Sequence, residues 1–438
     1  MKISIFGMGY VGAVSGACFA RLGHEVIGVD VNRGKVDMIN AGGAPVVEQG
    51  LAKLMAEGRA AGRISATDDA LEAVKESEIS LISVGTPTGN NGAQSLAALD
   101  AVVASIGQAI RHKNGAHSVV VRSTVMPRTT EERIAPRLEG ACGRQIGDGL
   151  ALSFNPEFLR EGAAIKDFFG PPFTVVGGVG ADGCAVAESL YAGIDAPLFA
   201  TTARIAESLK YACNSYHAVK IAFANELGAL MKAIGVDARE TMRIFCQDHD
   251  LNISPAYLRP GFAFGGSCLP KELRAIVDMA KAENLQLPML ANVIASNERH
   301  IERAFAMIQR RGRRKVALFG LAFKPGTDDL RESPLVSLAE RLIGKGFELA
   351  IFDRSVDLAR LTGTNLEYIE REIPHLDRLV SNSIEETLAG AGTIVVGHVP
   401  EDAVPTIAAA APGRCVIDLQ GVAALQNRAG IDYEGICW

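Results

Sequence analysis

The chain has 438 residues, which is too long for one hydrophobic core and predicts two or three domains. With 21% charged residues and a net charge of -6, it offers no electrostatic basis for binding nucleic acid or an anionic membrane surface. Its eight cysteines show no CxxC pair and no Cys/His metal spacing, so we expect no metal, no disulfide framework and a reducing, cytoplasmic environment. No apolar run reaches the 18 or so residues that a membrane span needs, so we expect no membrane insertion.

The first 29 residues have the order strand, turn, helix, strand. Residues 2–6 and 25–29 are short apolar runs that predict strands, and residues 13–22 between them are helical in character. This order is typical of the first unit of a dinucleotide-binding domain. Further strands are expected at residues 79–84, 118–121 and 151–154.

The turn after the first strand contains Gly7, Gly9 and Gly12. In a GxGxxG turn the glycines allow a tight bend, the approach of a pyrophosphate to the backbone, and close packing of helix against strand. Asp30 closes the second strand, 18 residues after Gly12, where a carboxylate can bind the adenosine ribose. A 2′-phosphate would be repelled there, so the pattern favours NAD over NADP.

The loops after the later strands are candidate site segments, because ligands bind beyond the carboxyl ends of parallel strands. These loops contain Thr86, Thr124 and Glu161, which are therefore candidate site residues. Asn155-Pro156-Glu157 is typical of a helix N-terminus, with a capping residue, a proline and an acid in the first turn. We therefore interpret Glu157 as structural.

Residues 203–234 contain no proline, and their apolar residues recur at helical spacing, which predicts a long central helix. Lys210, Asn214, His217 and Asn225 share a second, polar face. That face is either the solvated side of the helix or the lining of a cleft in which Lys210 and Asn214 bind a substrate. His217 alone would more often be a packed histidine.

A glycine-rich stretch near residue 268 carries a single cysteine. Gly265 and Gly266 leave room beside Cys268, and Pro270 with Lys271 predicts the start of a helix. A thiol at a helix N-terminus near an ammonium should be more acidic than a free thiol, and the thiolate is the reactive form. An inert cysteine in a tight turn is the alternative.

The last 130 residues repeat the strand–helix–strand order without a GxGxxG turn. Strands are expected at residues 315–319, 348–352, 393–396 and 416–419, and a helix should begin at Ser333-Pro334 and end by Gly346. The basic run 310–315 is expected to be solvated.

The fold class expected is α/β, with two Rossmann-like doubly wound domains joined by a long central helix. The domains expected are residues 1–200, 201–300 and 301–438.

Six motifs occur in order along the whole chain and resemble the UDP-glucose/GDP-mannose dehydrogenase family. They are Gly7-x-Gly9-x-x-Gly12, Val84-Gly85-Thr86-Pro87, Ser123-Thr124-Val125, Asn155-Pro156-Glu157-Phe158, Phe264-Gly265-Gly266-Ser267-Cys268 and Phe323-Lys324. Segments 246–249, 258–262, 328–334 and 434–438 are most similar to the members that oxidise GDP-mannose for alginate-type polysaccharide synthesis.

The resemblance implies two successive NAD-dependent oxidations at the sugar C6, from GDP-mannose to GDP-mannuronate. The first oxidation would give an aldehyde, to which the Cys268 thiolate adds. The resulting thiohemiacetal would be oxidised to a thioester, which water hydrolyses. The covalent link would retain the aldehyde between the two steps.

The resemblance also implies roles for the matching residues. Lys210 and Asn214 would stabilise oxyanionic intermediates, and Glu161 would assist thioester hydrolysis. Catalysis would involve Cys268, Glu161, Lys210, Asn214 and Thr124. NAD would contact Gly7, Gly9, Tyr10, Val11, Gly12, Asp30, Lys35, Thr86, Thr124, Lys271 and Arg331. The nucleotide sugar would contact Glu161, Lys210, Asn214, His217, Asn225, Tyr257, Arg259, Phe262, Gly265 and Lys324. In a homodimer or larger assembly with shared sites, the neighbouring chain would supply Tyr257, Arg259, Phe262 and Arg331.

Four places depart from the family pattern: Arg128 replaces the glycine of a usual Pro-Gly-Thr turn, the loop 89–95 is atypical, and Ala256 and Glu272 differ as well. Ala256 replaces an aromatic residue beside Tyr257, so UDP-glucose or another UDP-sugar is the alternative substrate. Glu272 stands where the family has aspartate. Two other classes remain open: a two-electron hydroxy-acid dehydrogenase, which would not need Cys268, and an NAD-binding redox sensor that turns over no sugar.

Overall fold

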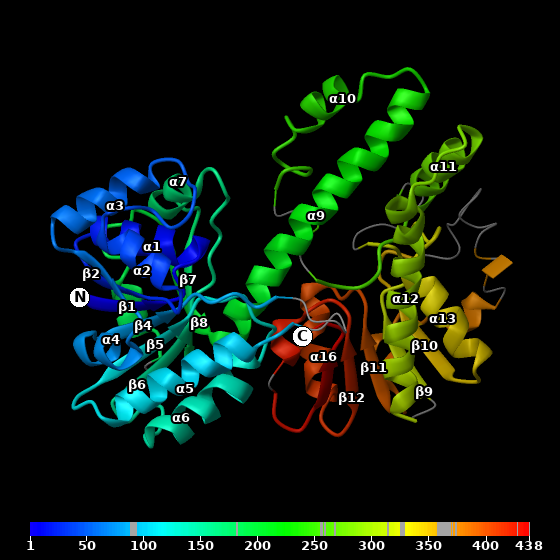
Figure 1. The fold of residues 1–438 in the computed structure, drawn as a ribbon. Coiled ribbons are helices and arrows are strands. Elements are labelled where there is room, and N and C mark those ends of the chain that lie inside the picture. Colours follow the sequence, from blue (N-terminus) through cyan, green and yellow to red (C-terminus); the bar gives the residue numbers. More distant parts are fainter. Residues whose placement is uncertain are drawn as a thin grey trace. The chain divides into compact units, whose positions relative to one another are not determined.

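The structure is a computed structural model that divides into two compact units, Met1–Ala218 and Val219–Trp438 (Figure 1). It describes residues 1–87, 94–180, 183–254, 257, 260–266, 269–312, 315–324, 329–356, 369, 371–372, 375–426 and 428–437, without the side chains of residues 221, 222, 271, 272 and 377. In this part of the chain, no helix is both long and apolar enough to cross a membrane. The expected domain boundaries near residues 200 and 300 stay predictions.

The first unit is built on an eight-stranded sheet in the order β3-β2-β1-β4-β5-β6-β7-β8. Its strands are β1 Lys2–Phe6, β2 Glu25–Val29, β3 Ile64–Thr67, β4 Ile79–Ile82, β5 His117–Val121, β6 Leu150–Phe154, β7 Thr174–Val179 and β8 Leu198–Thr202. Neighbouring strands are parallel except β6 and β7, which are antiparallel. The order reverses between β1 and β4, which is where such sheets bind ligands.

Helices cover both faces of this sheet (Figure 1). They are α1 Tyr10–Arg21, α2 Arg33–Asn40, α3 Leu51–Ala60, α4 Ala70–Glu76, α5 Ala97–Arg111, α6 Ala135–Cys142, α7 Ala164–Phe169 and α8 Ala185–Ser189, with a π-helical turn at Thr130–Ile134. One apolar core lies under α1, α3 and α7, and a second lies under α4, α5 and α6. The nearly all-apolar strands β4 and β5 fit this burial on both faces.

The expected long helix is α9, Ala203–Ala233, which has 31 residues and a length of about 46 Å. Ala203 and Ala206 on its first turns are buried in the first unit. Its second half belongs to the second unit, where Leu230 joins a small apolar cluster with residues of α11 and α12. The helices of this region are α10 Ala238–Phe245, α11 Leu269–Ala282 and α12 Pro288–Arg310.

The second unit contains a five-stranded parallel sheet in the order β10-β9-β11-β12-β13. Its strands are β9 Lys315–Phe319, β10 Glu348–Phe352, β11 Thr393–Val396, β12 Cys415–Asp418 and β13 Asp432–Gly435, and its remaining helices are α13 Pro334–Gly344, α15 Ile384–Leu388 and α16 Val404–Ala410. Short 3-10 turns lie at Leu376–Arg378, Glu401–Ala403 and Ala423–Leu425. The Ser333 hydroxyl accepts from the Leu335 amide and caps α13, as expected. The predicted fold class, two Rossmann-like domains and a long helix, is confirmed.

Two local predictions were wrong. No helix starts at Asn155: the segment to Arg160 has no regular secondary structure, and Asn155 is buried, where its amide donates to the Val175 carbonyl at 2.7 Å. The basic run is not simply solvated. Arg310 and Arg311 form ion pairs with carboxylates of β13, at 2.9 Å and 2.7 Å from Glu434.

Arg128 adopts a backbone conformation that favours glycine, with φ of 83°. Replacing Arg128 with glycine should raise the free energy of unfolding by about 1 kcal/mol, because an L-residue is strained at this φ. The exposed ion pair that Arg128 makes with Glu132 would be lost, but such pairs contribute only about 0.5 kcal/mol. Urea unfolding measures the change. Arg128→Ala, which loses the pair and keeps the strain, should be slightly destabilised; an equal gain in both variants would contradict the strain argument.

Candidate functional site

The glycine-rich turn at the end of β1 fits a bound dinucleotide. Gly7 has φ of 93°, and a Cβ on Gly12 would lie 1.9 Å from the Gly7 carbonyl oxygen, so the turn and α1 touch closely. A Cβ on Gly9 would meet no atom within 4 Å, and Gly9 caps α1 without a side-chain hydrogen bond. The space beside Gly9 at the N-terminus of α1 is therefore open, as a pyrophosphate site requires.

Asp30 lies at the end of β2 beside this turn. Its carboxylate accepts hydrogen bonds from the Met8 amide and the Asn32 amide, both at 2.9 Å. The Lys35 ammonium lies 3.4 Å from the same group. These contacts fix the carboxylate at the end of the strand, where the ribose of the expected cofactor would be bound.

Thr86 and Thr124, predicted from separate loops, lie together. The Thr86 hydroxyl donates to the Thr124 carbonyl at 2.8 Å. Gln94, which we did not predict, joins both, because its amide donates to the Thr124 carbonyl at 2.7 Å and to the Thr86 hydroxyl at 2.8 Å. The two loops thus form one surface at the carboxyl ends of β4 and β5.

Lys210 on α9 is buried and paired with Glu157. Its ammonium donates to the Glu157 carbonyl at 2.6 Å and to the Glu157 carboxylate at 2.9 Å. The two side chains are 9% and 13% exposed. The ammonium also lies 5.4 Å from the centre of the Phe158 ring, a cation–π contact. The interpretation of Glu157 as a first-turn acid is therefore wrong: it is the counter-ion of Lys210.

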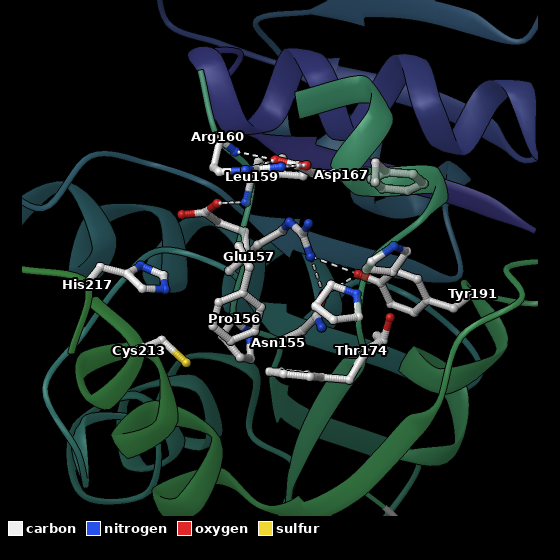
Figure 2. A pocket seen from close by; sticks show the side chains of 16 residues that line it. Asn155, Pro156, Glu157, Leu159, Arg160, Asp167, Thr174, Tyr191, Cys213 and His217 are labelled. Carbon is white, nitrogen blue, oxygen red and sulfur yellow. Dashed lines mark hydrogen bonds and ion pairs between the residues drawn. The ribbon is translucent and has the colours of Figure 1, made fainter. Parts of the chain in front are cut away.

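A cavity of about 340 Å³ opens beside this pair (Figure 2). Cys213 and His217 of α9 line one side, facing Glu157 and Pro156. His217 is exposed and is not the packed histidine that we expected, and Asn214 on the same turn is exposed too. Burial raises the pKa of the Cys213 thiol, and the nearby Lys210 partly offsets this, so Cys213 is protonated at neutral pH.

Glu161 follows in the same loop, with an exposed side chain. On one side, Arg160 is held by Asp167, which accepts from the Arg160 amide at 2.9 Å and from its guanidinium at 2.7 Å. The guanidinium holds the pKa of the Asp167 carboxyl below its usual range. On the other side, the Gly162 amide donates to the Glu48 carboxylate at 2.8 Å.

Glu48 also binds Tyr10, the first residue of α1. The Tyr10 hydroxyl donates to the Glu48 carboxylate at 2.6 Å. Burial, and then this hydrogen bond, raises the pKa of Tyr10, while the hydroxyl lowers the pKa of Glu48. Val11, the next residue on α1, is partly exposed.

In the second unit, Gly265 and Gly266 pack closely against the chain. A Cβ on Gly265 would lie 2.3 Å from the Glu332 carbonyl oxygen, and one on Gly266 would lie 2.8 Å from the Phe323 ring. Lys324 is exposed, with its ammonium 5.3 Å from the centre of the same ring. These glycines therefore allow the loop to rest on Phe323, the residue before Lys324.

The segment before these glycines is fixed to α12. The Asn297 side chain accepts from the Phe264 amide at 2.9 Å and donates to the Phe264 carbonyl at 2.8 Å. Phe262 is partly buried against the core of this unit. Tyr257 is 86% exposed, with φ of 62°.

The other predicted residues of this unit differ in their surroundings. Arg331 is bound to Asp329, with 2.8 Å between guanidinium and carboxylate. Asn225 is exposed on α9. Cys268, Arg259, Ala256 and the side chains of Lys271 and Glu272 lie outside the described residues.

Three stretches of the chain match domains of one protein family. Residues 1–195 match the NAD binding domain of the UDP-glucose/GDP-mannose dehydrogenase family, residues 204–299 its central domain, and residues 317–423 its UDP binding domain. The prediction of NAD as cofactor is confirmed by the first of these matches.

Relatives that match over 100% of both chains carry names from the same family. The chain is 48% identical to a GDP-mannose 6-dehydrogenase of Pseudomonas aeruginosa and 46% identical to one of Azotobacter vinelandii, each over 100% of both chains. It is 34% identical to UDP-glucose 6-dehydrogenase AglM of Haloferax volcanii, also over 100% of both. A crystal structure described as a ternary complex of GDP-mannose dehydrogenase from Pseudomonas aeruginosa superposes over 100% of both chains, with a TM-score of 0.95 and 48% identity. The chain therefore belongs to the UDP-glucose/GDP-mannose dehydrogenase family.

Proposed function

We propose that this protein is an NAD-dependent dehydrogenase that oxidises the C6 alcohol of GDP-mannose to a carboxylate, giving GDP-mannuronate. The observation that carries the proposal is the 48% identity, over 100% of both chains, to an enzyme named for this reaction. The identity to the UDP-glucose enzyme is lower, at 34%. The prediction of a GDP-sugar is thereby favoured over a UDP-sugar.

The chain's own groups would bind and orient the reactants. NAD, when bound, supplies the two-electron oxidant for each step. The open N-terminus of α1 at Gly9 would hold its pyrophosphate and Asp30 its adenosine ribose, which leaves the nicotinamide end toward Thr86 and Thr124. Cys268 would add to the aldehyde of the first oxidation, so that the second oxidation gives a thioester without release of the aldehyde.

Lys210 would stabilise the negative oxygen at C6 in both steps. Its ammonium carries three protons and, within the described residues, donates two hydrogen bonds, both to Glu157. The third proton is left for a substrate oxygen, and Asn214 one turn further on would donate a second hydrogen bond. Glu161 would take a proton from the water that hydrolyses the thioester.

The count of NADH per sugar tests the proposal. Purified protein with limiting GDP-mannose should form two NADH per molecule consumed, with GDP-mannuronate as the only sugar product. A parallel reaction with UDP-glucose should be slow. One NADH per GDP-mannose would contradict the thiol step. Activity with UDP-glucose and none with GDP-mannose would contradict the proposed substrate and leave the mechanism in place.

We also propose that the protein works in the cytoplasm as a homodimer, in which each site takes residues from both chains. The second unit exposes large apolar residues on α9, on α10 and in the segments that follow them. They are Val219, Ile234, Val236, Ile244, Leu251 and Ile253. No residue of α10 is buried, and such a surface is typical of an interface.

Light scattering should therefore give at least twice the mass of one 46.3 kDa chain. Mixing Cys268→Ala and Arg331→Ala proteins, each unable alone to form the carboxylate, should restore part of the carboxylate formation if a site combines both chains. A monomeric, active protein would contradict the proposal.

A further inference from the structure

Glu48 connects two segments that the proposed function uses. It lies three residues before α3, and its carboxylate accepts hydrogen bonds from the Tyr10 hydroxyl at 2.6 Å, the Gly162 amide at 2.8 Å and the Ala164 amide at 3.1 Å. These donors come from parts of the chain that are 38, 114 and 116 residues away. Three donors on one carboxylate make charge-assisted hydrogen bonds, which are stronger than neutral ones.

One end of this connection is the cofactor turn. Tyr10 is the first residue of α1 and follows Gly9, beside which a Cβ would meet no atom within 4 Å. Its ring packs against the core of the first unit, so the hydroxyl has a fixed direction. A pyrophosphate bound at the N-terminus of α1 would lie next to the backbone of Tyr10.

The other end is the loop that carries Glu161. Ala163, the capping residue of α7, offers no side-chain hydrogen bond, so Glu48 supplies the acceptor for the first amide of that helix, Ala164, and for the Gly162 amide just before it. Asp167 holds Arg160 on the opposite side of Glu161. The backbone of Glu161 is thus fixed on both sides, although its side chain is exposed.

We propose that Glu48 is a positioning residue that couples the first turn of the cofactor-binding helix to the loop that places Glu161. The role of Glu161 in this inference rests on the proposed function, whereas the coupling rests on the contacts of Glu48. When a cofactor orders the turn at Gly9, Tyr10 holds the Glu48 carboxylate in place, and the carboxylate holds Gly162 and Ala164. The Glu161 carboxylate, which would activate the water, is therefore held in position when the cofactor is bound.

Loss of this connection should leave α7 folded. Ala164 and Phe168 of α7 are buried in the core of the first unit, and α7 lies beside α1 (Figure 1). The amides of Gly162 and Ala164 can be followed directly by hydrogen–deuterium exchange, without any sugar. The experiment compares wild type, Tyr10→Phe, Glu48→Gln and the control Glu57→Gln on the exposed face of α3, each with and without saturating NAD.

In wild type and in Glu57→Gln, NAD should slow the exchange of these two amides about tenfold. In Tyr10→Phe the amides keep their acceptor, but the slowing by NAD should be lost. In Glu48→Gln both amides should exchange about tenfold faster even without NAD. Equal slowing by NAD in wild type and Tyr10→Phe would overturn the coupling.

Turnover gives a second readout. Glu48→Gln should lower kcat about tenfold and the KM for GDP-mannose with it, so that kcat/KM stays near that of wild type, because thioester hydrolysis follows both oxidations. A fall in thermal stability alone, with kcat and exchange as in wild type, would overturn the positioning role. Because the exchange experiment contains no sugar, it decides the coupling even if GDP-mannose is not the substrate.

Discussion

Lys210→Met should lower kcat by about 10²–10³-fold and the free energy of unfolding by about 3–5 kcal/mol. The substitution keeps the volume of the side chain but leaves the Glu157 carboxylate in a site where it is 13% exposed and has lost its counter-ion. Catalysis would lose the donor to the oxygen at C6, an effect of about 10²–10³-fold in kcat for one such donor. Urea unfolding and NADH formation measure the two effects separately.

A paired variant separates the fold from the chemistry. In Lys210→Met with Glu157→Leu, no charge is left in the buried site, so most of the lost stability should return. Turnover should not return, because no ammonium is available. Full stability in the single variant would contradict the burial of the pair, and activity in the double variant would contradict the role of Lys210.

Strands of both sheets could be predicted closely from the sequence where the signal is local, but β3, β7, β8 and β13 were not predicted. Residues 2–6, 25–29, 315–319 and 348–352 are strands with the expected bounds. Each is an apolar run closed by glycine or aspartate, and the signal is local. The antiparallel direction of β7 was not predictable in this way, because strand direction depends on how the chain returns to the sheet.

The site was predictable only where its signal was local. Asn155-Pro156-Glu157 has the sequence pattern of a helix start, but no helix forms there, and Lys210, 53 residues further on, binds Glu157. Glu48 has no pattern around it that points to Tyr10 or Gly162. Gln94 likewise gave no signal. Such residues are recognised only when the fold has brought their partners to them.

The glycines before Cys268 have a role in the described structure that the sequence analysis did not predict. They were expected to leave room for a ligand, since glycine permits close approach. Instead, their α-carbons approach the chain itself: the Glu332 backbone at Gly265 and the Phe323 ring at Gly266. A side chain at either position would push the loop away from these neighbours, so the glycines set where the loop can lie.

Cys268→Ala should abolish formation of the carboxylate, with a loss of at least about 10³-fold, because no thiohemiacetal can form. Hydride transfer from the alcohol does not need the thiol, so the variant should form at most one NADH per GDP-mannose and release an aldehyde. A hydrazine reagent traps that aldehyde, and mass spectrometry counts it against the acid.

Cys246→Ala is the matched control, because Cys246 is an exposed cysteine at the end of α10. It should form two NADH per sugar, as wild type does. Cys213 is less suitable as the nucleophile in any alternative mechanism, since burial raises the pKa of its thiol. If Cys268→Ala still gave two NADH and the acid, the covalent link between the two oxidations would not exist, and the aldehyde would have to be oxidised as its hydrate without leaving the site.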